Sequence, residues 1–389
     1  MTTPPLSAAQ IVPTARQKAM LALSFLALST LGMIHPANAK EVTYIIFDPP
    51  GSTYTQPNSI NRKGAITGSY RDAQFVNHGF LRDRDGTITS FDPPGSNNTQ
   101  PAGINREGAI TGTYTDASGV IHGFLRARDG SFTAFDPSGS LGTSALAING
   151  RGEITGSYSD GTLVHGFRRS RDGTFTTFDP PGSNETDPTG INEAGEITGS
   201  DTDANSVIHG FLRAGDGTFT TFDASGSNNT NPRGINQSGE ITGFYMDSSS
   251  ASHGFLRSPD GTLVVVDFPG AILTVPTSIN SKGVITGVYN DANFANHGFL
   301  RSRDGTFTTF DPPGSTDTIP YGINSAGTIV GVANQGHGFL RIEDKREEDE
   351  QGDKNLAARS MGRGWLVASE RRRSDIPILK EAKAEYAKL

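Results

Sequence analysis

One phrase recurs along most of the chain at an almost constant spacing. The phrase FDPPGS, or a close variant, begins at seven positions separated by 43 or 44 residues: Phe47, Phe91, Phe135, Phe178, Phe222, Val266 and Phe310. We number the units that begin there repeats 1 to 7. Each unit reads approximately FDPPGSxxTxPxGINxxGxITGxYxDAxxxxHGFLRxRDGTFTT. A period of this length indicates one repeat architecture rather than several unrelated domains.

Turn signals divide each repeat into four short β-prone segments. In repeat 2 the first segment ends at Asn105, and the next three are Ala109–Tyr114, His122–Arg126 and Ser131–Phe135. Asp129-Gly130 is a strong hairpin signal between the last two segments. The Asp-Pro-Pro-Gly that follows cannot continue a sheet, because proline lacks a backbone donor. Helical repeats are excluded, because the apolar residues show no 3.6-residue period.

Four antiparallel strands in about 44 residues are typical of a propeller blade. The segment Val42–Phe47 resembles a fourth strand, whereas repeat 7 loses the pattern after Arg341 and has only three. An N-terminal strand that completes the last blade would close a ring and cover exposed sheet edges. We therefore predict an all-β fold, a seven-bladed β-propeller of four-stranded blades over residues 40–341. A β-solenoid is the structural alternative.

Residues 1–39 have the order of a secretory signal peptide. Arg16 and Lys18 precede the apolar run Ala19–Ile34, and the small-x-small sequence Ala37-Asn38-Ala39 follows. This order predicts cleavage after Ala39 and an exported, periplasmic or extracellular protein. A membrane anchor is the alternative, but a helix of 16 residues rises only about 24 Å, against a membrane core of about 30 Å.

The repeat region and the C-terminal segment of the mature chain differ in charge. Residues 40–341 hold 20 basic and 30 acidic side chains, a net charge of −10 that argues against nucleic acid as a partner. Residues 342–389 hold 11 of each sign, so we predict a low-order tail with a short helix at Ile378–Leu389. A partner-binding tail and an unselected extension both remain open. The absence of cysteine excludes a disulfide scaffold and thiolate chemistry.

The phrases INxxGxITG and HGF carry a family resemblance. The unit resembles the HAF family of bacterial extracellular repeat proteins, whose pattern has an Ile-Asn, a glycine-containing turn, a second glycine and then His-Ala-Phe. Here Gly79 and its equivalents replace the alanine, and Leu-Arg follows where the family has an aromatic residue. The resemblance covers residues 41–341. It implies an exported, propeller-like protein and no particular reaction.

Seven of the eight histidines occupy one position of the repeat: His78, His122, His165, His209, His253, His297 and His337. Third-strand residues of neighbouring blades would lie more than about 10 Å apart. They could not share a zinc ion, whose nitrogen ligands lie about 2.1 Å away. We therefore expect no metal and assign these histidines to a hydrogen-bond network within each blade. The expected partners are the aspartates of the preceding loops: Asp72, Asp116, Asp160, Asp203, Asp247 and Asp291.

Seven asparagines also recur at one position: Asn61, Asn105, Asn149, Asn192, Asn236, Asn280 and Asn324. Asparagine followed by glycine three residues later favours a tight turn capped by the side-chain amide. A ring of asparagines around one mouth of the channel is the alternative. We favour turn capping and treat these residues, like the histidines, as structural.

A single reaction centre requires residues that only one or two repeats provide. Three deviations stand out: Asp201 in place of tyrosine, Arg168 in place of leucine, and Phe268 after Val264–Asp267. None forms a nucleophile–base pair, a phosphate loop or a metal-ligand spacing. We assign no catalytic residue and no cofactor, and the binding residues remain unassigned.

The loops between the second and third strands vary most: Ala73–Asn77, Ala117–Ile121, Gly161–Val164, Ala204–Ile208, Ser248–Ser252 and Ala292–Asn296. They should share one face with the loops that connect successive repeats, and variable loops on a fixed scaffold suit recognition. We therefore predict a monomeric, non-enzymatic scaffold that binds a protein or glycan, with no membrane span in the mature chain. One alternative is an envelope hydrolase or lyase with ionisable groups at the channel mouth. The other is a structural surface protein.

The signal-peptide prediction has a direct chemical test. Expression of the full chain in a Gram-negative host should yield an exported protein whose N-terminus is Lys40, because cleavage after Ala39 removes the apolar segment. N-terminal sequencing and intact mass measurement identify the first residue. An uncleaved chain retained in the membrane fraction would support the anchor instead.

Overall fold

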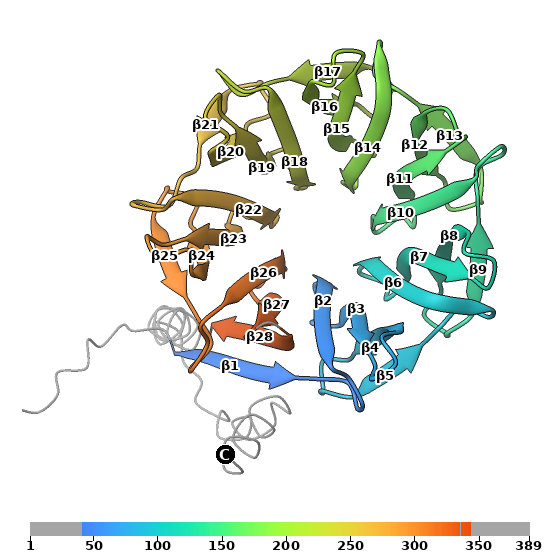
Figure 1. Ribbon diagram of the computed structural model, residues 1–389, viewed down its shortest axis with the longest axis horizontal. Helices are drawn as coiled ribbons and strands as arrows, with labels where there is room; N and C mark the ends of the chain where they lie inside the picture. Colours follow the sequence, from blue (N-terminus) through green and yellow to red (C-terminus); the bar gives the residue numbers. More distant parts are fainter. Residues whose placement is uncertain (1–40, 335, 344–389) are drawn as a thin grey trace, which may run out of the picture. The chain divides into compact units, whose positions relative to one another are not determined.

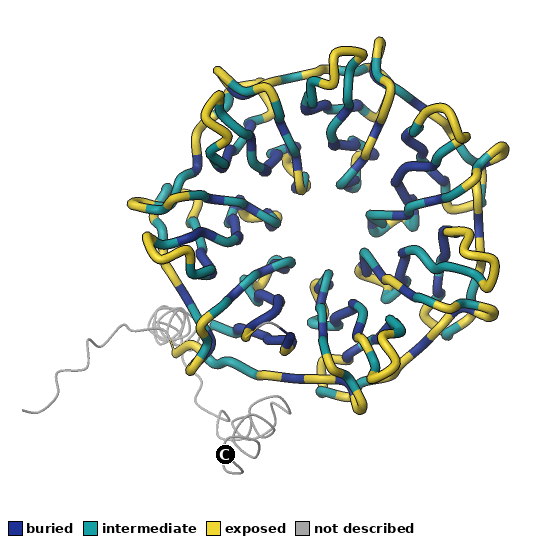
Figure 2. The backbone as a smooth tube through the Cα atoms, viewed as in Figure 1, coloured by how far each residue is buried: buried dark blue, intermediate teal, exposed yellow. Residues whose placement is uncertain are grey.

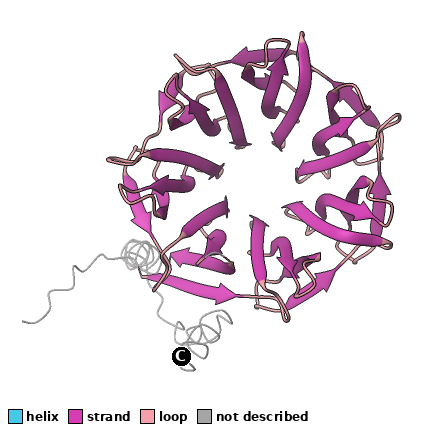
Figure 3. Cartoon of the chain, in the orientation of Figure 1, coloured by secondary structure: helices cyan, strands magenta, loops and turns pink. Residues whose placement is uncertain are grey.

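The computed structural model describes residues 41–334 and 336–343. Within this part of the chain all 28 secondary-structure elements are β-strands (Figure 3). The described residues contain no helix that is long and apolar enough to cross a membrane. The predicted signal peptide (residues 1–39) and most of the predicted tail (342–389) lie outside the described residues. The first two tail residues, Ile342 and Glu343, continue strand β28 because they pair with Thr43 and Val42.

Each repeat folds into an antiparallel group of strands. The first strands are β2 (Tyr54–Ile60), β6 (Ser96–Ile104), β10 (Gly142–Ile148), β14 (Ser183–Ile191), β18 (Asn229–Ile235), β22 (Leu273–Ile279) and β26 (Thr318–Ile323). The second strands are β3 (Ile66–Arg71), β7 (Ile110–Asp116), β11 (Ile154–Ser159), β15 (Ile197–Asp203), β19 (Ile241–Met246), β23 (Ile285–Asn290) and β27 (Ile329–Ala333).

The outer strands complete the groups. The third strands are β4 (Asn77–Arg82), β8 (Ile121–Arg126), β12 (Val164–Arg169), β16 (Ile208–Arg213), β20 (Ser252–Arg257), β24 (Asn296–Arg301) and β28 (His337–Glu343). The fourth strands are β5 (Ile88–Phe91), β9 (Phe132–Phe135), β13 (Phe175–Phe178), β17 (Phe219–Phe222), β21 (Leu263–Val265) and β25 (Phe307–Phe310). The predicted four-strand pattern is confirmed, with strand ends displaced by one or two residues in repeat 2.

The groups lie around a common axis, with the first strand of each repeat innermost (Figure 1). Within a group every neighbouring pair of strands is antiparallel. Single parallel bridges between β12 and β14 and between β16 and β18 join three groups into one extended sheet. No continuous sheet therefore runs around the described residues.

The N-terminal strand β1 (Val42–Phe47) pairs with the C-terminal strand β28. The register is antiparallel and runs from Val42 opposite Glu343 to Phe47 opposite Gly338. The predicted pairing of the first strand with the last repeat is confirmed. It covers the edge of β28, which would otherwise be open to another chain.

The core of each repeat is built from two recurring side chains. The phenylalanine of HGF is fully buried in all repeats: Phe80, Phe124, Phe167, Phe211, Phe255, Phe299 and Phe339. The isoleucine of ITG is fully buried as well: Ile66, Ile110, Ile154, Ile197, Ile241, Ile285 and Ile329. Buried residues lie inside each group, and exposure rises toward the loops and the outer strands (Figure 2).

Gly79 explains why this chain has HGF where the resembling family has His-Ala-Phe. A Cβ atom at Gly79 would lie 2.5 Å from Cε2 of Phe91, whose ring packs across the strand. The guanidinium carbon of Arg126, in the next strand group, lies 4.9 Å from the centre of the Phe91 ring. An alanine here would therefore displace the aromatic ring that connects one repeat to the next.

The repeated asparagines both cap turns and connect the repeats. Oδ1 of Asn105 accepts hydrogen bonds from the backbone N–H groups of Glu107 and Ala109, at 3.0 Å each. Its Nδ2 donates to the backbone carbonyl of Asn149, the equivalent residue of the next repeat, at 3.2 Å. The same bond recurs at every junction, and Asn324 donates to Asn61 at 3.1 Å. Turn capping and a ring of asparagines are therefore present together.

The Asp-Gly pairs form hairpin turns, as predicted. In repeat 2 the N–H of Gly130 donates to the carbonyl of Ala127 at 3.0 Å, and Gly130 has a φ of 90°. Side chains other than glycine rarely adopt this left-handed conformation. The pair therefore fixes where the third strand turns back into the fourth.

Replacing one asparagine tests the importance of the connections between repeats. Asn105→Ala removes one bond to Asn149 and two bonds that cap its own turn, so we expect a loss of about 1–3 kcal/mol in the free energy of unfolding. Urea denaturation measures the loss. Asn97→Ala, at an exposed position of the same repeat, is the control and should change stability by less than about 0.5 kcal/mol.

Candidate functional site

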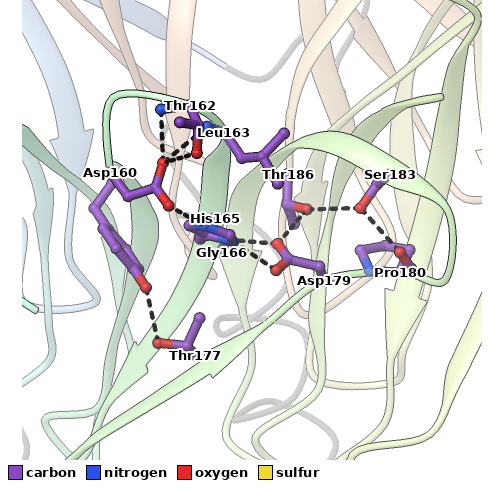
Figure 4. Close-up of polar contacts among 11 residues, drawn as sticks. Asp160, Thr162, Leu163, His165, Gly166, Thr177, Asp179, Pro180, Ser183 and Thr186 are labelled. Carbon is purple, nitrogen blue, oxygen red and sulfur yellow. Dashed lines mark hydrogen bonds and ion pairs between the residues drawn. The ribbon is translucent and has the colours of Figure 1, made fainter. Parts of the chain in front are cut away.

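The repeated histidine lies at the centre of a polar network in each repeat. In repeat 3, Nδ1 of His165 is 2.7 Å from Oδ2 of Asp179, and Nε2 is 3.4 Å from Oδ2 of Asp160 (Figure 4). Asp179 also accepts a hydrogen bond at 2.8 Å from the hydroxyl group of Thr186, which belongs to the next repeat. The network therefore joins the third strand, the preceding loop and the neighbouring repeat.

The sequence prediction identified one of the two aspartates. The loop aspartate is present as expected, but the shorter contact is made by the aspartate of FDPP, at 2.7–2.8 Å in every repeat. These partners are Asp92, Asp136, Asp179, Asp223, Asp267, Asp311 and, for His337, Asp48. The sequence signal for these pairs is the fixed spacing of 14 residues from histidine to aspartate in repeats 1 to 6.

The histidine contacts place two sets of loops on one face. Each contacted loop aspartate is the last residue of the second strand or the first residue after it, and each FDPP aspartate starts the connection to the next repeat. The loop aspartate also holds its own turn, since Oδ1 of Asp72 accepts backbone hydrogen bonds from Gln74 and Val76 at 2.8 and 2.9 Å. The expected clustering of the variable loops with the inter-repeat connections is confirmed. We call this surface the loop face.

In five repeats a tyrosine packs beside the histidine. Tyr70 and His78, for example, have ring centres 5.2 Å apart, and repeats 2, 3, 5 and 6 have the same pair. Repeat 7 has Ala333 at this position, and repeat 4 has Asp201. The substitution in repeat 4 places a carboxylate directly opposite His209 in the strand pairing.

Asp201 lines a pocket of about 420 Å³ on the loop face. The lining residues are Pro181, Gly182, Asp201, Asp203, Ala204, Asn205, His209, Thr221 and Asp223. Only 4% of Asp201 is exposed, and its buried Oδ1 has no hydrogen-bond partner in the described structure. Burial is the main reason that its pKa rises to about 6, and the neighbouring carboxylates Asp223 and Asp203 add to the effect.

His209 is the only basic side chain among these lining residues. Its Nδ1 lies 2.8 Å from Oδ2 of Asp223, and its Nε2 lies 3.8 Å from Oδ2 of Asp203. Burial opposes protonation of the imidazole, but the bond to Asp223 and the charges of the three carboxylates raise its pKa overall. The pocket thus combines three acids with one histidine that is already engaged by two of them.

The described residues contain no group of three or more histidine, aspartate or glutamate side chains close enough to hold a metal ion. A pocket of this volume lies within the usual range for small-molecule sites, about 300–1,000 Å³.

The other sequence deviations have local partners. Arg168 forms an ion pair with Glu153, and the ring of Phe268 stacks on Tyr289 with a centre-to-centre distance of 3.8 Å. Glu196 and Glu240 accept hydrogen bonds from the repeated asparagines at 2.6 Å. These side chains are used in packing and turn capping, whereas Asp201 has an unused acceptor.

Two aromatic side chains project from the loop face. Phe75 and Phe294 are 79% and 75% exposed, and both have a φ of 64°. The equivalent positions in repeats 2, 4 and 5 are Gly119, Ser206 and Ser250, which also have positive φ. Sequence analysis placed these loops correctly but did not single out the two phenylalanines, whose exposure depends on the fold.

No protein-family model and no curated protein matches the chain. Solved structures are similar to the chain in fold. A streptogramin B lyase matches with 16% identity and a TM-score of 0.53, over 77% of this chain and 97% of that one. A catalytically inactive histidine-to-alanine variant of virginiamycin B lyase from Staphylococcus aureus, with quinupristin, matches with 12% identity and a TM-score of 0.56, over 78% and 100%.

The propeller domain of the Trilobed protease from Pyrococcus furiosus is also similar. It has 10% identity and a TM-score of 0.54, over 75% of this chain and 94% of that domain. At such identities the similarity concerns the fold. The described part of the chain is a β-propeller, and its chemistry has to be inferred from its own residues.

The raised pKa of Asp201 predicts a specific pH dependence of stability. Its pKa is about 6 in the folded chain and 3.8 ordinarily, so its contribution to stability is complete below about pH 4 and is lost as the pH rises through 6. Between pH 4 and 7 the wild type should lose about 2 kcal/mol relative to Asp201→Asn. Urea denaturation across this range measures the difference, with Glu185→Gln as a charge-matched control. Parallel profiles for all three proteins would contradict the prediction.

Proposed function

We propose that the chain is an exported, seven-bladed β-propeller that binds a protein or a glycan through its loop face. The proposal includes membership of the HAF-like repeat proteins that the sequence resembles. Residues 1–39 are the signal peptide, the propeller extends from residue 40 to the end of β28 at Glu343, and a low-order tail follows. The pairing of β1 with β28 supports a closed ring, in which the last blade contains both ends of the propeller.

The observation that carries the binding function is the exposure of Phe75 and Phe294 at positive φ. A non-glycine residue in this conformation lowers the stability of the fold by about 1–2 kcal/mol. An exposed aromatic ring regains little of this free energy by burial within the chain. Aromatic side chains supply rigid contact area in interfaces. The cost is offset if these rings are buried against a ligand.

The placement of the two rings defines a binding area. Phe75 belongs to repeat 1 and Phe294 to repeat 6, and the asparagine bonds place repeat 7 between them. Three residues connect β27 to β28 in repeat 7, whereas five connect β3 to β4 in repeat 1. The two phenylalanine loops therefore flank a shorter loop, and the proposed ligand contacts both rings.

A double substitution tests this function without introducing a foreign residue type. Phe75→Ser with Phe294→Ser places at both loop tips the residue that repeats 4 and 5 already have. We expect capture of surface proteins or glycans to weaken by at least about tenfold, because each buried aromatic contact contributes about 1 kcal/mol or more. Pull-down from envelope extracts and glycan arrays measure the binding.

The control variant is Val265→Thr, which removes an exposed apolar side chain from the outer strand β21. It should bind like the wild type. Equal capture by all three proteins would contradict a role for the two loops. The absence of any ligand, together with measurable turnover in an activity screen, would favour the envelope hydrolase or lyase. Self-assembly without another ligand would favour a structural surface protein.

A further inference from the structure

We infer that the repeat-4 pocket on the loop face binds an organic cation that carries N–H donors, a primary ammonium or guanidinium group. The inference rests on the proposed function, in which the loop face is the recognition surface, and it names the chemical group that one part of this surface takes. Lysine and arginine side chains of a protein, and free amines, share this chemistry.

Asp201 has an unpaired acceptor in the pocket wall. Its Oδ1 is buried and has no hydrogen-bond partner in the described structure, and the residue is only 4% exposed. A buried polar group without a partner is costly. Tyrosine stands here in five other repeats and packs on the histidine. Aspartate in this place therefore weakens the packing of repeat 4 and leaves an acceptor that a ligand can satisfy.

The pocket wall is acidic. Asp201, Asp203 and Asp223 line it, and no lysine or arginine is among the lining residues. The one basic residue, His209, is engaged by Asp223 and Asp203. Residues 40–341 also carry a net charge of −10. The local and the overall field therefore both attract a positively charged group and repel an anion.

The pocket has room for an organic group, since its volume is about 420 Å³. An ammonium or guanidinium group presents several N–H donors at once. It can donate to the carboxylate of Asp201, and Thr221 supplies a hydroxyl group in the same wall.

Agmatine, which carries both groups, is a suitable probe for the full mature chain. We expect it to bind the wild type at neutral pH, and we expect Asp201→Asn to weaken binding by at least about tenfold, because a hydrogen bond to a charged group contributes about 1.5–3 kcal/mol. Asp201→Tyr restores the residue of the other repeats and should abolish binding. Isothermal titration calorimetry and saturation-transfer NMR measure the affinity.

Two controls separate the pocket from general charge. Glu185→Gln removes the same charge from an exposed position of the same repeat that does not line the pocket, and it should bind agmatine like the wild type. Butyrate and the neutral N-butylacetamide should not bind. Titration with an acetyl-lysine peptide and its unmodified lysine counterpart distinguishes a peptide source, which only the unmodified peptide should satisfy, from a free amine.

The outcomes also separate this inference from the proposed function. Equal agmatine binding by the wild type, Asp201→Asn and Glu185→Gln, or no binding at millimolar concentrations, would overturn the cation pocket. Capture that depends on Phe75 and Phe294 would still support the loop face as a recognition surface. Agmatine binding that depends on Asp201, in a protein that captures neither protein nor glycan, would keep the pocket and overturn the broader proposal.

Discussion

The structure depends on the bond from each repeated asparagine to the backbone of the next repeat. Sheet pairing joins only three neighbouring repeats, through β12–β14 and β16–β18, so most junctions need another connection. The Nδ2 group supplies it, and the bond from Asn324 to Asn61 extends it across residues that are 263 positions apart. Because the Oδ1 atom of each asparagine also caps its own turn, one side chain fixes both the turn and its position against the neighbouring repeat.

The histidine network performs the corresponding task at the loop face. It connects a loop, a third strand and an inter-repeat connection. The loop conformations can differ because the histidine and the backbone of the loop hold the aspartate at the base of each loop. This separation of scaffold and loops allows Phe75, Phe294 and Asp201 to break the symmetry locally. Each of these three residues lowers the stability of the fold, through backbone strain or through an unpaired acceptor, and all three lie on the loop face. Their placement supports recognition as the function of that face.

The similarity to lyase structures concerns the path of the chain and not its chemistry. Propellers with 10–16% identity to this chain carry different activities in their own names. The alternative of an enzyme predicted that one cluster of ionisable groups breaks the symmetry at the channel mouth. A cluster that breaks the symmetry lies on β15, β16 and the loops beside them. The pocket is thus better described by what it can hold than by a reaction that a neighbour performs.

The sequence by itself determined the number and order of the strands, the hairpin turns and the pairing of Val42–Phe47 with the last repeat, because these follow from local periodicity and turn chemistry. It also identified Asp201 as a deviation. Only the tertiary structure decided that Asp92 and its equivalents engage the histidines, that Asn105 reaches Asn149, and that removing a tyrosine leaves a pocket with an unpaired oxygen. Side chains 14 or 44 residues apart meet only when strands pair and repeats pack, so the sequence records their spacing but not their contact.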